Sequence, residues 1–100
     1  MGQLQSIGHN GQPLQAAFRR VDPPMPVLVD LSAVFPREPH SAGGYHPAGL
    51  QMHGIVDGML SCWGLCEQGH WWGWVTYEVA YGPHRREVTH WLPAWTLRRR

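Results

Sequence analysis

The sequence lacks lysine altogether, contains only 2 cysteines, and has a charged fraction of 15% over its 100 residues. Without lysine the chain cannot form a Schiff base or complete a phosphate-binding P-loop. The 8 basic residues are balanced by 7 acidic ones, and the net charge of +1 does not indicate a dedicated nucleic-acid-binding protein. The low charge, together with 12 glycines and 9 prolines, also disfavours a helical bundle.

Long hydrophobic segments are missing as well. No stretch approaches the roughly 18 apolar residues that a membrane-spanning helix needs, and the first residues lack the basic and apolar regions of a secretion signal. We therefore expect a cytoplasmic protein that has no membrane partner and keeps both cysteines reduced. A chain of 100 residues is also short for two domains, so we expect one folded domain.

Short apolar runs separated by turn residues predict a mainly β fold. Residues 1–26 are rich in Gln, Gly and Pro, and we expect a largely irregular segment there, a flexible tail followed by a Pro-rich linker. Residues 27–100 are expected to form a small antiparallel barrel with a long loop at 36–49, and Asp57-Gly58 is a two-residue hairpin signal. The predicted strands are 27–31, 51–56, 59–65, 71–81, 87–92 and 96–98.

Six tryptophans are too many to hide in the interior of so small a domain, so part of the indole surface should face solvent or a partner. Side chains alternate along residues 71–81, which places Trp71 on the face of the core valines and Trp72 and Trp74 on the opposite face. We assign Trp63 and Trp71 to the core. The predicted protein-binding residues are Trp72, Trp74, Glu78, Trp91, Pro93 and Trp95.

The next predicted strand carries Trp91 on the side that extends this aromatic stripe by cross-strand pairing. We therefore expect a non-enzymatic binding module that contacts a protein partner, or a second copy of itself, through the Trp-rich face. No pair of carboxylates and no nucleophile followed by a base indicates a catalytic site. We expect no cofactor, with zinc as the one alternative considered below.

The C-terminal third resembles the closing section of SH3-like small barrels. The residues concerned are Trp71-Trp72-Gly73 and Trp91-Leu92-Pro93-Ala94-Trp95-Thr96-Leu97. In that family a Trp-Trp pair opens a central strand, and an apolar-apolar-Pro-Ala/Ser step makes a single 3₁₀ turn before the last strand. The resemblance covers residues 70 to 98. It implies an SH3-like barrel whose peptide groove would fall on Trp71 or Trp72 and on Pro93, with Trp95 as the nearest aromatic residue beyond that proline.

A second resemblance concerns the N-terminus. The residues Ser6-Ile7-Gly8-His9-Asn10-Gly11, followed by Pro13-Leu14, are similar to a short N-terminal signature of small proteins encoded on bacterial phages and plasmids. This resemblance implies that the protein comes from a mobile genetic element. Small proteins of that origin include inhibitors and adaptors, so it also implies an inhibitor or adaptor of a host complex.

The arginines support an alternative function, the binding of nucleic acid. Arginines beside a tryptophan stripe could combine contacts to phosphates with base stacking, which single-stranded nucleic acid requires. The competing interpretation is a charged hairpin tip and a solubilising C-terminus. The residues concerned are Arg85, Arg86, Arg98, Arg99 and Arg100.

The most metal-like spacing in the chain is Cys62-x3-Cys66-x3-His70, and His90 is the candidate fourth zinc ligand. On an extended strand the two thiols would lie roughly 13 Å apart, so only a turn could bring both onto one ion. The competing interpretation is that both thiols pack as small hydrophobic groups. An enzyme on the same fold is a further alternative. Plasmid-borne SH3-like dihydrofolate reductases carry Val-Gln-Ile-Tyr where this chain has Val88-Thr89-His90-Trp91.

Overall fold

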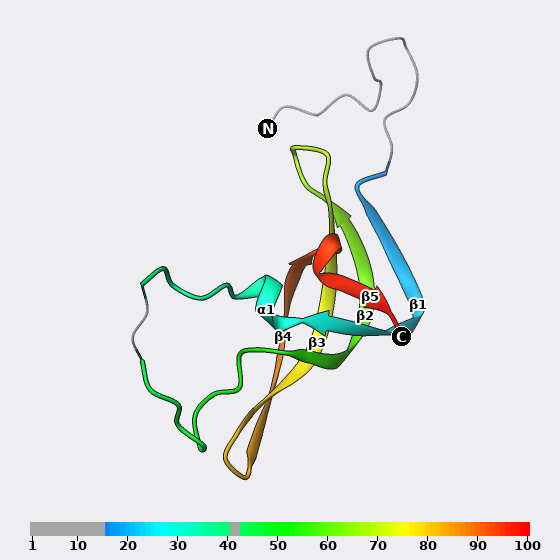
Figure 1. Ribbon diagram of the computed structural model, residues 1–100. Coiled ribbons are helices and arrows are strands. Elements are labelled where there is room, and N and C mark those ends of the chain that lie inside the picture. Colours follow the sequence, from blue (N-terminus) through cyan, green and yellow to red (C-terminus); the bar gives the residue numbers. More distant parts are fainter. Residues whose placement is uncertain (1–15, 41–42) are drawn as a thin grey trace, which may run out of the picture.

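The fold is mainly β, as the sequence predicted, and consists of one five-stranded antiparallel sheet with strand order β4-β3-β2-β1-β5 (Figure 1). The computed structural model describes residues 16–40 and 43–100. None of the helices in these residues is long and apolar enough to cross a membrane. In chain order the elements are β1 (Phe18–Asp30), α1 (Leu31–Val34), β2 (Ile55–Leu65), β3 (Trp71–Tyr81), β4 (His84–Pro93), η1 (Ala94–Thr96) and β5 (Leu97–Arg99).

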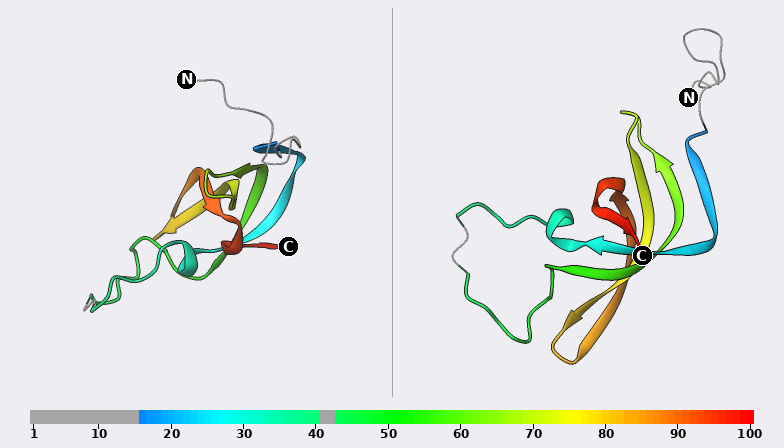
Figure 2. Two further views of the ribbon diagram at one scale, coloured as in Figure 1. Left: turned by 90° about the horizontal axis from the view of Figure 1, so that it is seen from above. Right: turned by 45° about the vertical axis from the view of Figure 1, so that its right-hand side comes forward.

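The sheet is bent but not closed, and this corrects the expected barrel. In the described residues β5 pairs with β1 and β4 pairs with β3, and no ladder joins β4 to β5. The bend accompanies two register shifts, between Arg20 and Met25 in β1 and between Leu60 and Cys62 in β2. Such irregularities increase the local twist of a strand. Figure 2 shows the sheet curving while β4 and β5 remain separate edges.

Strand β2 passes through Asp57 and Gly58, where the sequence predicted a hairpin turn. Strand β2 therefore joins the predicted strand at 59–65 to residues 55–56, whereas residues 51–54, also predicted as strand, lie outside it. A Cβ on Gly58 would lie 3.0 Å from methyl groups of both Val29 and Val75. The glycine thus serves close packing inside a strand, which is the second common reason for a glycine in a β pattern.

Strand β1 is also longer than the predicted strand at 27–31. It starts at Phe18, and the Pro-rich residues expected to form a linker lie within it. Pairing with β2 is interrupted between Arg20 and Met25, where Pro23 and Pro24 fall, while Pro26 lies opposite Met59. Proline has no backbone N–H to donate to a ladder, so it is tolerated where pairing is broken. The part of the expected tail at residues 1–15 lies outside the described residues.

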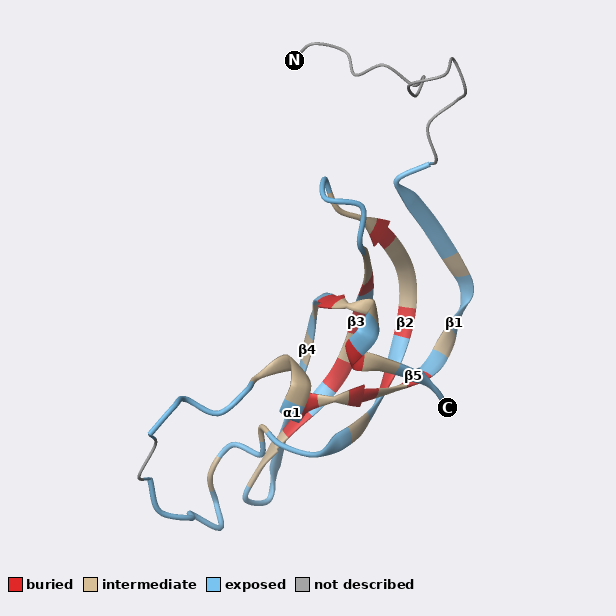
Figure 3. Cartoon of the chain, turned by 45° about the horizontal axis from the view of Figure 1, so that its top comes forward, coloured by how far each residue is buried: buried red, intermediate tan, exposed pale blue. Residues whose placement is uncertain are grey.

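The hydrophobic core lies on the concave side of the bent sheet, which we call the core face; the opposite side is the outer face (Figure 3). The alternation predicted for β3 is confirmed, since Gly73, Val75, Tyr77 and Val79 are all buried. Gly73 is needed there because a Cβ would lie 2.7 Å from Leu97 Cδ1 of β5. The buried hydrophobic residues are Val27, Val29, Leu31, Leu60, Val75, Tyr77, Val79 and Leu92.

The assignment of two tryptophans to the core is wrong. Trp63 is half-buried and packs against the side of the core cluster, and Trp71 is half-buried outside it. The Arg19 guanidinium lies 5.0 Å above the Trp71 ring centre. Because the sheet does not close, the core-face ends of β2 and β3 stay open, and valine and leucine side chains together with Tyr77 fill the interior.

Candidate functional site

The outer face carries aromatic side chains from three strands at one end of the sheet. The register places Phe18 opposite Gly64, Gly64 opposite Trp72, and Trp72 opposite Pro93, so that these four residues form one row. The adjacent row contains Trp74 opposite Trp91, the cross-strand pair expected from the sequence. We call Phe18, Trp72, Trp74 and Trp91 the aromatic patch.

Much of the aromatic patch is exposed. The exposed fractions are 66% for Phe18, 37% for Trp74 and 39% for Trp91, whereas Trp72 is half-buried. The Trp74 and Trp91 ring centres lie 5.1 Å apart, and the Phe18 and Trp91 ring centres lie 6.2 Å apart, both pairs tilted. Tilted aromatic pairs at such separations attract each other beyond their area burial. The patch is therefore ordered by its own contacts while part of its surface stays open to a partner.

Gly64 makes this arrangement of rings fit. A Cβ at Gly64 would lie 2.9 Å from Trp91 Cζ3 and 3.3 Å from Phe18 Cε1. The indole of Trp91 on β4 therefore reaches across β3 onto β2, where it meets the first residue of β1. Neither Phe18 nor Gly64 was predicted from the sequence as part of a binding surface. A glycine inside a predicted strand was the one available signal, since it often marks a close approach.

A groove of about 350 Å³ opens beside the aromatic patch. Its volume falls at the lower end of the range for small-ligand sites, and its lining is almost entirely hydrocarbon and aromatic. An apolar side chain of a partner is the chemical group that such a lining accommodates. The groove is lined by Phe18, Gly64, Leu65, Cys66, Trp72 and Trp91.

Cys66 stands at the rim of the groove, in the turn between β2 and β3. Its backbone N–H donates to the His70 carbonyl at 2.9 Å, and the N–H of Gly69 donates to the Cys66 carbonyl at 2.9 Å. Backbone hydrogen bonds from His70 and then Gln68 lower the pKa of the Cys66 thiol, because N–H donors stabilise the thiolate. The groove thus has a thiol at its edge that ionises more readily than an ordinary cysteine.

The four candidate zinc ligands do not converge. The turn brings Cys66 near His70, but the Cys62 sulfur lies 3.4 Å from the Trp63 carbonyl, to which it can donate. His90 lies on the core face, where its Nε2 hydrogen-bonds the Tyr77 hydroxyl at 2.9 Å and its ring stacks on Phe35. Burial lowers the pKa of His90. Residues 16–40 and 43–100 contain no group of three or more potential metal ligands.

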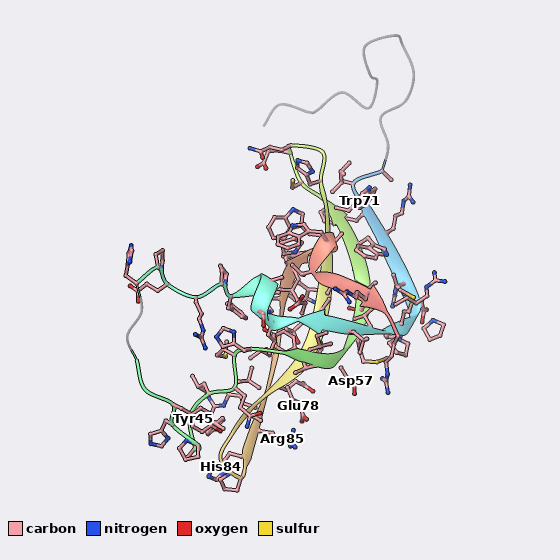
Figure 4. The ribbon with its side chains drawn as sticks, in the orientation of Figure 1. Tyr45, Asp57, Trp71, Glu78, His84 and Arg85 are labelled. Atoms are coloured by element: carbon pink, nitrogen blue, oxygen red, sulfur yellow. The ribbon has the colours of Figure 1, made fainter. Side chains whose placement is uncertain are left out.

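The charged candidates lie at the opposite end of the outer face. Glu78 faces Glu87 across β3 and β4, and Arg85 faces Ala80. Figure 4 shows Glu78 and Arg85 together, away from Trp71. They line a second depression of about 570 Å³, the polar hollow, whose charged residues are Asp57, Glu78, Arg85, Glu87 and Arg100.

The remaining candidate residues divide between the two ends. Pro93 lies in the row of Trp72, whereas Trp95, 74% exposed in η1, is not among the residues that line the groove. In the C-terminal arginine run, Arg100 Nε lies 3.4 Å from Asp57 Oδ1. Arg86 faces Val79 and extends from the core face of β4. The five arginines proposed for nucleic acid are thus not gathered around the tryptophans.

No family model, curated protein or solved structure matches this chain. The function is therefore argued from the geometry of these two surfaces.

Proposed function

We propose that this protein is a binding module that docks another protein through the aromatic patch. The observation that carries the proposal is the exposed pair Trp74 and Trp91 beside an apolar groove. Covering apolar surface stabilises a complex by about 25 cal/mol per Å² of area removed from water. Tryptophans in a preformed cluster lose little conformational entropy on binding, and they are frequent among the residues that dominate interface energies.

The shape and charge around the groove favour a partner that inserts an apolar side chain. The Phe18, Trp72 and Trp91 rings line the groove, and the absence of a side chain at Gly64 lets the Trp91 ring lie close against β2. Arg20 is exposed and lies opposite Cys62, in the row that continues through Trp74. A carboxylate next to the inserted side chain would therefore meet positive charge, which favours correct orientation.

The geometry favours a protein over a nucleic acid as the partner. Between the aromatic patch and Arg85 lie the pair Thr76–Thr89 and then the acidic pair Glu78–Glu87. A strand of nucleic acid that stacked on the tryptophans would pass two carboxylates before it reached that arginine. Such repulsion opposes the phosphate contacts that give nucleic-acid complexes most of their affinity.

The relation to SH3-like barrels, the mobile-element origin and the cytoplasmic location are also proposals. The 3₁₀ turn η1 follows Pro93, which supports the SH3-like relation, although the sheet is open. The resemblance to phage and plasmid proteins depends on residues 6–14, which lie outside the described part of the chain. An inhibitor or adaptor that acts through protein contact would need no more than the docking surface proposed here.

Affinity capture with matched variants tests the proposal. Wild type and the Trp95→Ala variant should capture the same stoichiometric partner from the native host, whereas Trp74→Ala should lose it. Trp95 is the control because it is more exposed than Trp74 but belongs neither to the aromatic patch nor to the groove lining. With the purified partner, Trp74→Ala should weaken binding by about 2 kcal/mol in calorimetry. Equal binding by all three proteins would overturn the proposal.

A further inference from the structure

Strand β4 is a long sheet edge, and no second strand of the described residues pairs with it. It has ten residues, from His84 to Pro93, and pairs with β3 on one side only. The other terminal strand, β5, has three residues. An exposed edge presents a row of backbone donors and acceptors that can pair with another strand. The length of β4 is therefore the first reason to expect a partner strand.

Charge protects only half of this edge. The first half of β4 carries three exposed charged side chains, Arg85, Arg86 and Glu87. The second half, from Val88 to Leu92, has no acidic residue, lysine or arginine and includes the exposed Trp91. Charged residues usually prevent indiscriminate pairing at sheet edges. Because they occur in only one half of β4, they limit the registers in which another strand can pair with it.

A second copy of the same strand complements this asymmetry. When two identical strands pair antiparallel about a two-fold axis, the first half of each lies beside the second half of the other. Centred on Val88, the pairing places Arg85 opposite Trp91 of the second copy, Glu87 opposite Thr89, and Val88 opposite itself. Side chains of the outer face then meet only side chains of the outer face, because directly opposed residues share a side.

Two unsatisfied features of one chain are relieved in this arrangement. Arg85 has no acidic partner, since the one ion pair of the described residues joins Arg100 to Asp57. Across the two-fold axis its guanidinium would reach the exposed part of the Trp91 indole, a favourable cation–π contact. No two acidic side chains face each other across this interface.

We propose that a second copy of this chain pairs with β4 through its own β4, antiparallel and centred on Val88, so that the two sheets become one continuous sheet. The charged half of one β4 lies beside the aromatic half of the other, so the strand is complementary to itself. This complementarity favours a second copy over a foreign strand. This goes beyond the proposed docking function, because backbone pairing at the sheet edge holds the dimer. Trp91 belongs to both surfaces, since it lines the groove and would also meet Arg85 of the second copy.

Sedimentation of the full chain over a concentration series tests the pairing. Wild type should show a reversible monomer–dimer equilibrium. Thr89→Glu should raise the dimer dissociation constant about tenfold, because two like-charge pairs with Glu87 arise by symmetry. Thr89→Arg should lower it. Both variants remove the same Thr76–Thr89 hydrogen bond of 2.8 Å, so the difference between them does not reflect that loss.

Cross-linking checks the register. In a Cys62→Ser, Cys66→Ser background, Val88→Cys should form an intermolecular disulfide under mild oxidation, because the two residues face each other at the axis. Glu87→Cys is the matched control and should stay unlinked, since it faces residue 89 of the second copy. A chain that is monomeric at every concentration overturns the proposal. A dimer that ignores both Thr89 substitutions, or that links through residue 87, also overturns it.

Loss of dimerisation is distinguishable from loss of partner binding. The Thr89 variants leave all groove-lining residues in place, so capture through the aromatic patch should persist in a monomeric Thr89→Glu protein. Conversely, Trp74→Ala should abolish capture while the dimer persists. A dimer that dissociates in Trp74→Ala but not in Thr89→Glu would be held by the outer face and would overturn β4 pairing.

Discussion

The outer face of the sheet contains two hollows built on the same strands, and they differ in chemistry. The groove beside the aromatic patch measures about 350 Å³ and is almost purely apolar, whereas the polar hollow measures about 570 Å³ and is lined by charged side chains of both signs. The row Thr76–Thr89 lies at the edge of the polar hollow, which Thr76 lines, and the next row of the outer face, Trp74–Trp91, belongs to the aromatic patch. On an open antiparallel sheet, side-chain rows run across the strands, so a change of residue type in one row is enough to end one surface and begin another.

The division indicates separate roles for the two ends. The aromatic patch gains free energy when it is covered, because its apolar surface leaves water. Covering the polar hollow would instead remove its charged side chains from water, which costs free energy. Glu78 and Glu87 repel each other, and among the described residues only Arg100 and Asp57 form an ion pair within the hollow. The predictions below test this contrast by changing one end and using the other as the control.

The largest expected effect is that of Trp91→Ala. Trp91 contacts Phe18 and Trp74, and its ring covers Gly64. Because the side chain is partly exposed, we expect the free energy of unfolding to fall by about 2 kcal/mol, less than for a fully buried tryptophan. Urea denaturation measures the change. Glu87→Ala in the polar hollow should alter stability by no more than about 0.5 kcal/mol. Equal losses from the two substitutions would remove the contrast.

Gly64→Ala should have the next largest effect. The new methyl group would meet the Trp91 ring at 2.9 Å, so the indole must move away from Phe18 and the groove must change shape. We expect a loss of about 1 kcal/mol in the free energy of unfolding and a changed near-ultraviolet circular dichroism signal from the tryptophan pair. Gly44→Ala is the control, because no atom lies within 4 Å of its added Cβ. Identical spectra for the two variants would contradict the close packing at Gly64.

A smaller effect of opposite sign is expected in the polar hollow. Glu87→Gln removes the repulsion with Glu78 and should raise the free energy of unfolding by roughly 0.3 kcal/mol at low salt. High salt should shrink this gain, because the two carboxylates are exposed and screened. Asp57→Asn, which removes the ion pair with Arg100, should change stability in the opposite direction. Destabilisation by Glu87→Gln would show that the carboxylate has a favourable partner.

The sequence predicted the parts of this surface that depend on local periodicity. Alternation along β3 separates Val75 and Val79 from Trp74 correctly, because a half-buried strand has a period of two. The short connection between β3 and β4 also sets their register, which brings Trp91 beside Trp74. These features follow from residues close together in the chain.

The features that were missed depend on distant contacts. Gly58 was predicted to lie in a turn because glycine is common both in turns and at close contacts inside strands. The close contacts at Gly58 are with methyl groups of β1 and β3, which are distant in the sequence. In the sequence, Phe18 is an isolated aromatic residue in a segment expected to be irregular. Only its pairing with Gly64 of β2 places it in the aromatic patch. Closure of the sheet depends on whether β4 meets β5, which no local pattern encodes, so the predicted core positions of Trp63 and Trp71 were wrong.

The smallest expected effect concerns chemical reactivity rather than stability. Hydrogen bonds from the backbone N–H groups of His70 and Gln68 lower the pKa of Cys66, so its thiolate forms at a lower pH than that of an ordinary cysteine. Cys62 lies instead within β2, where its sulfur is 3.4 Å from the Trp63 carbonyl. In single-thiol proteins made with Cys62→Ser or Cys66→Ser, alkylation at neutral pH should be faster at Cys66.

The pH profile of this alkylation tests the direction of the pKa shift of Cys66, and protection by a bound partner tests whether the groove is the binding surface. The rate at Cys66 should rise as pH increases and reach half of its plateau at a lower pH than for an ordinary cysteine, since the reaction follows the thiolate fraction and the pKa of Cys66 is lowered. Because Cys66 lines the groove, a bound partner should slow the reaction at Cys66 and leave a probe near Glu78 unaffected. If the partner protected the polar hollow and left Cys66 reactive, the binding surface would lie at the charged end and the contrast between the two hollows would be reversed.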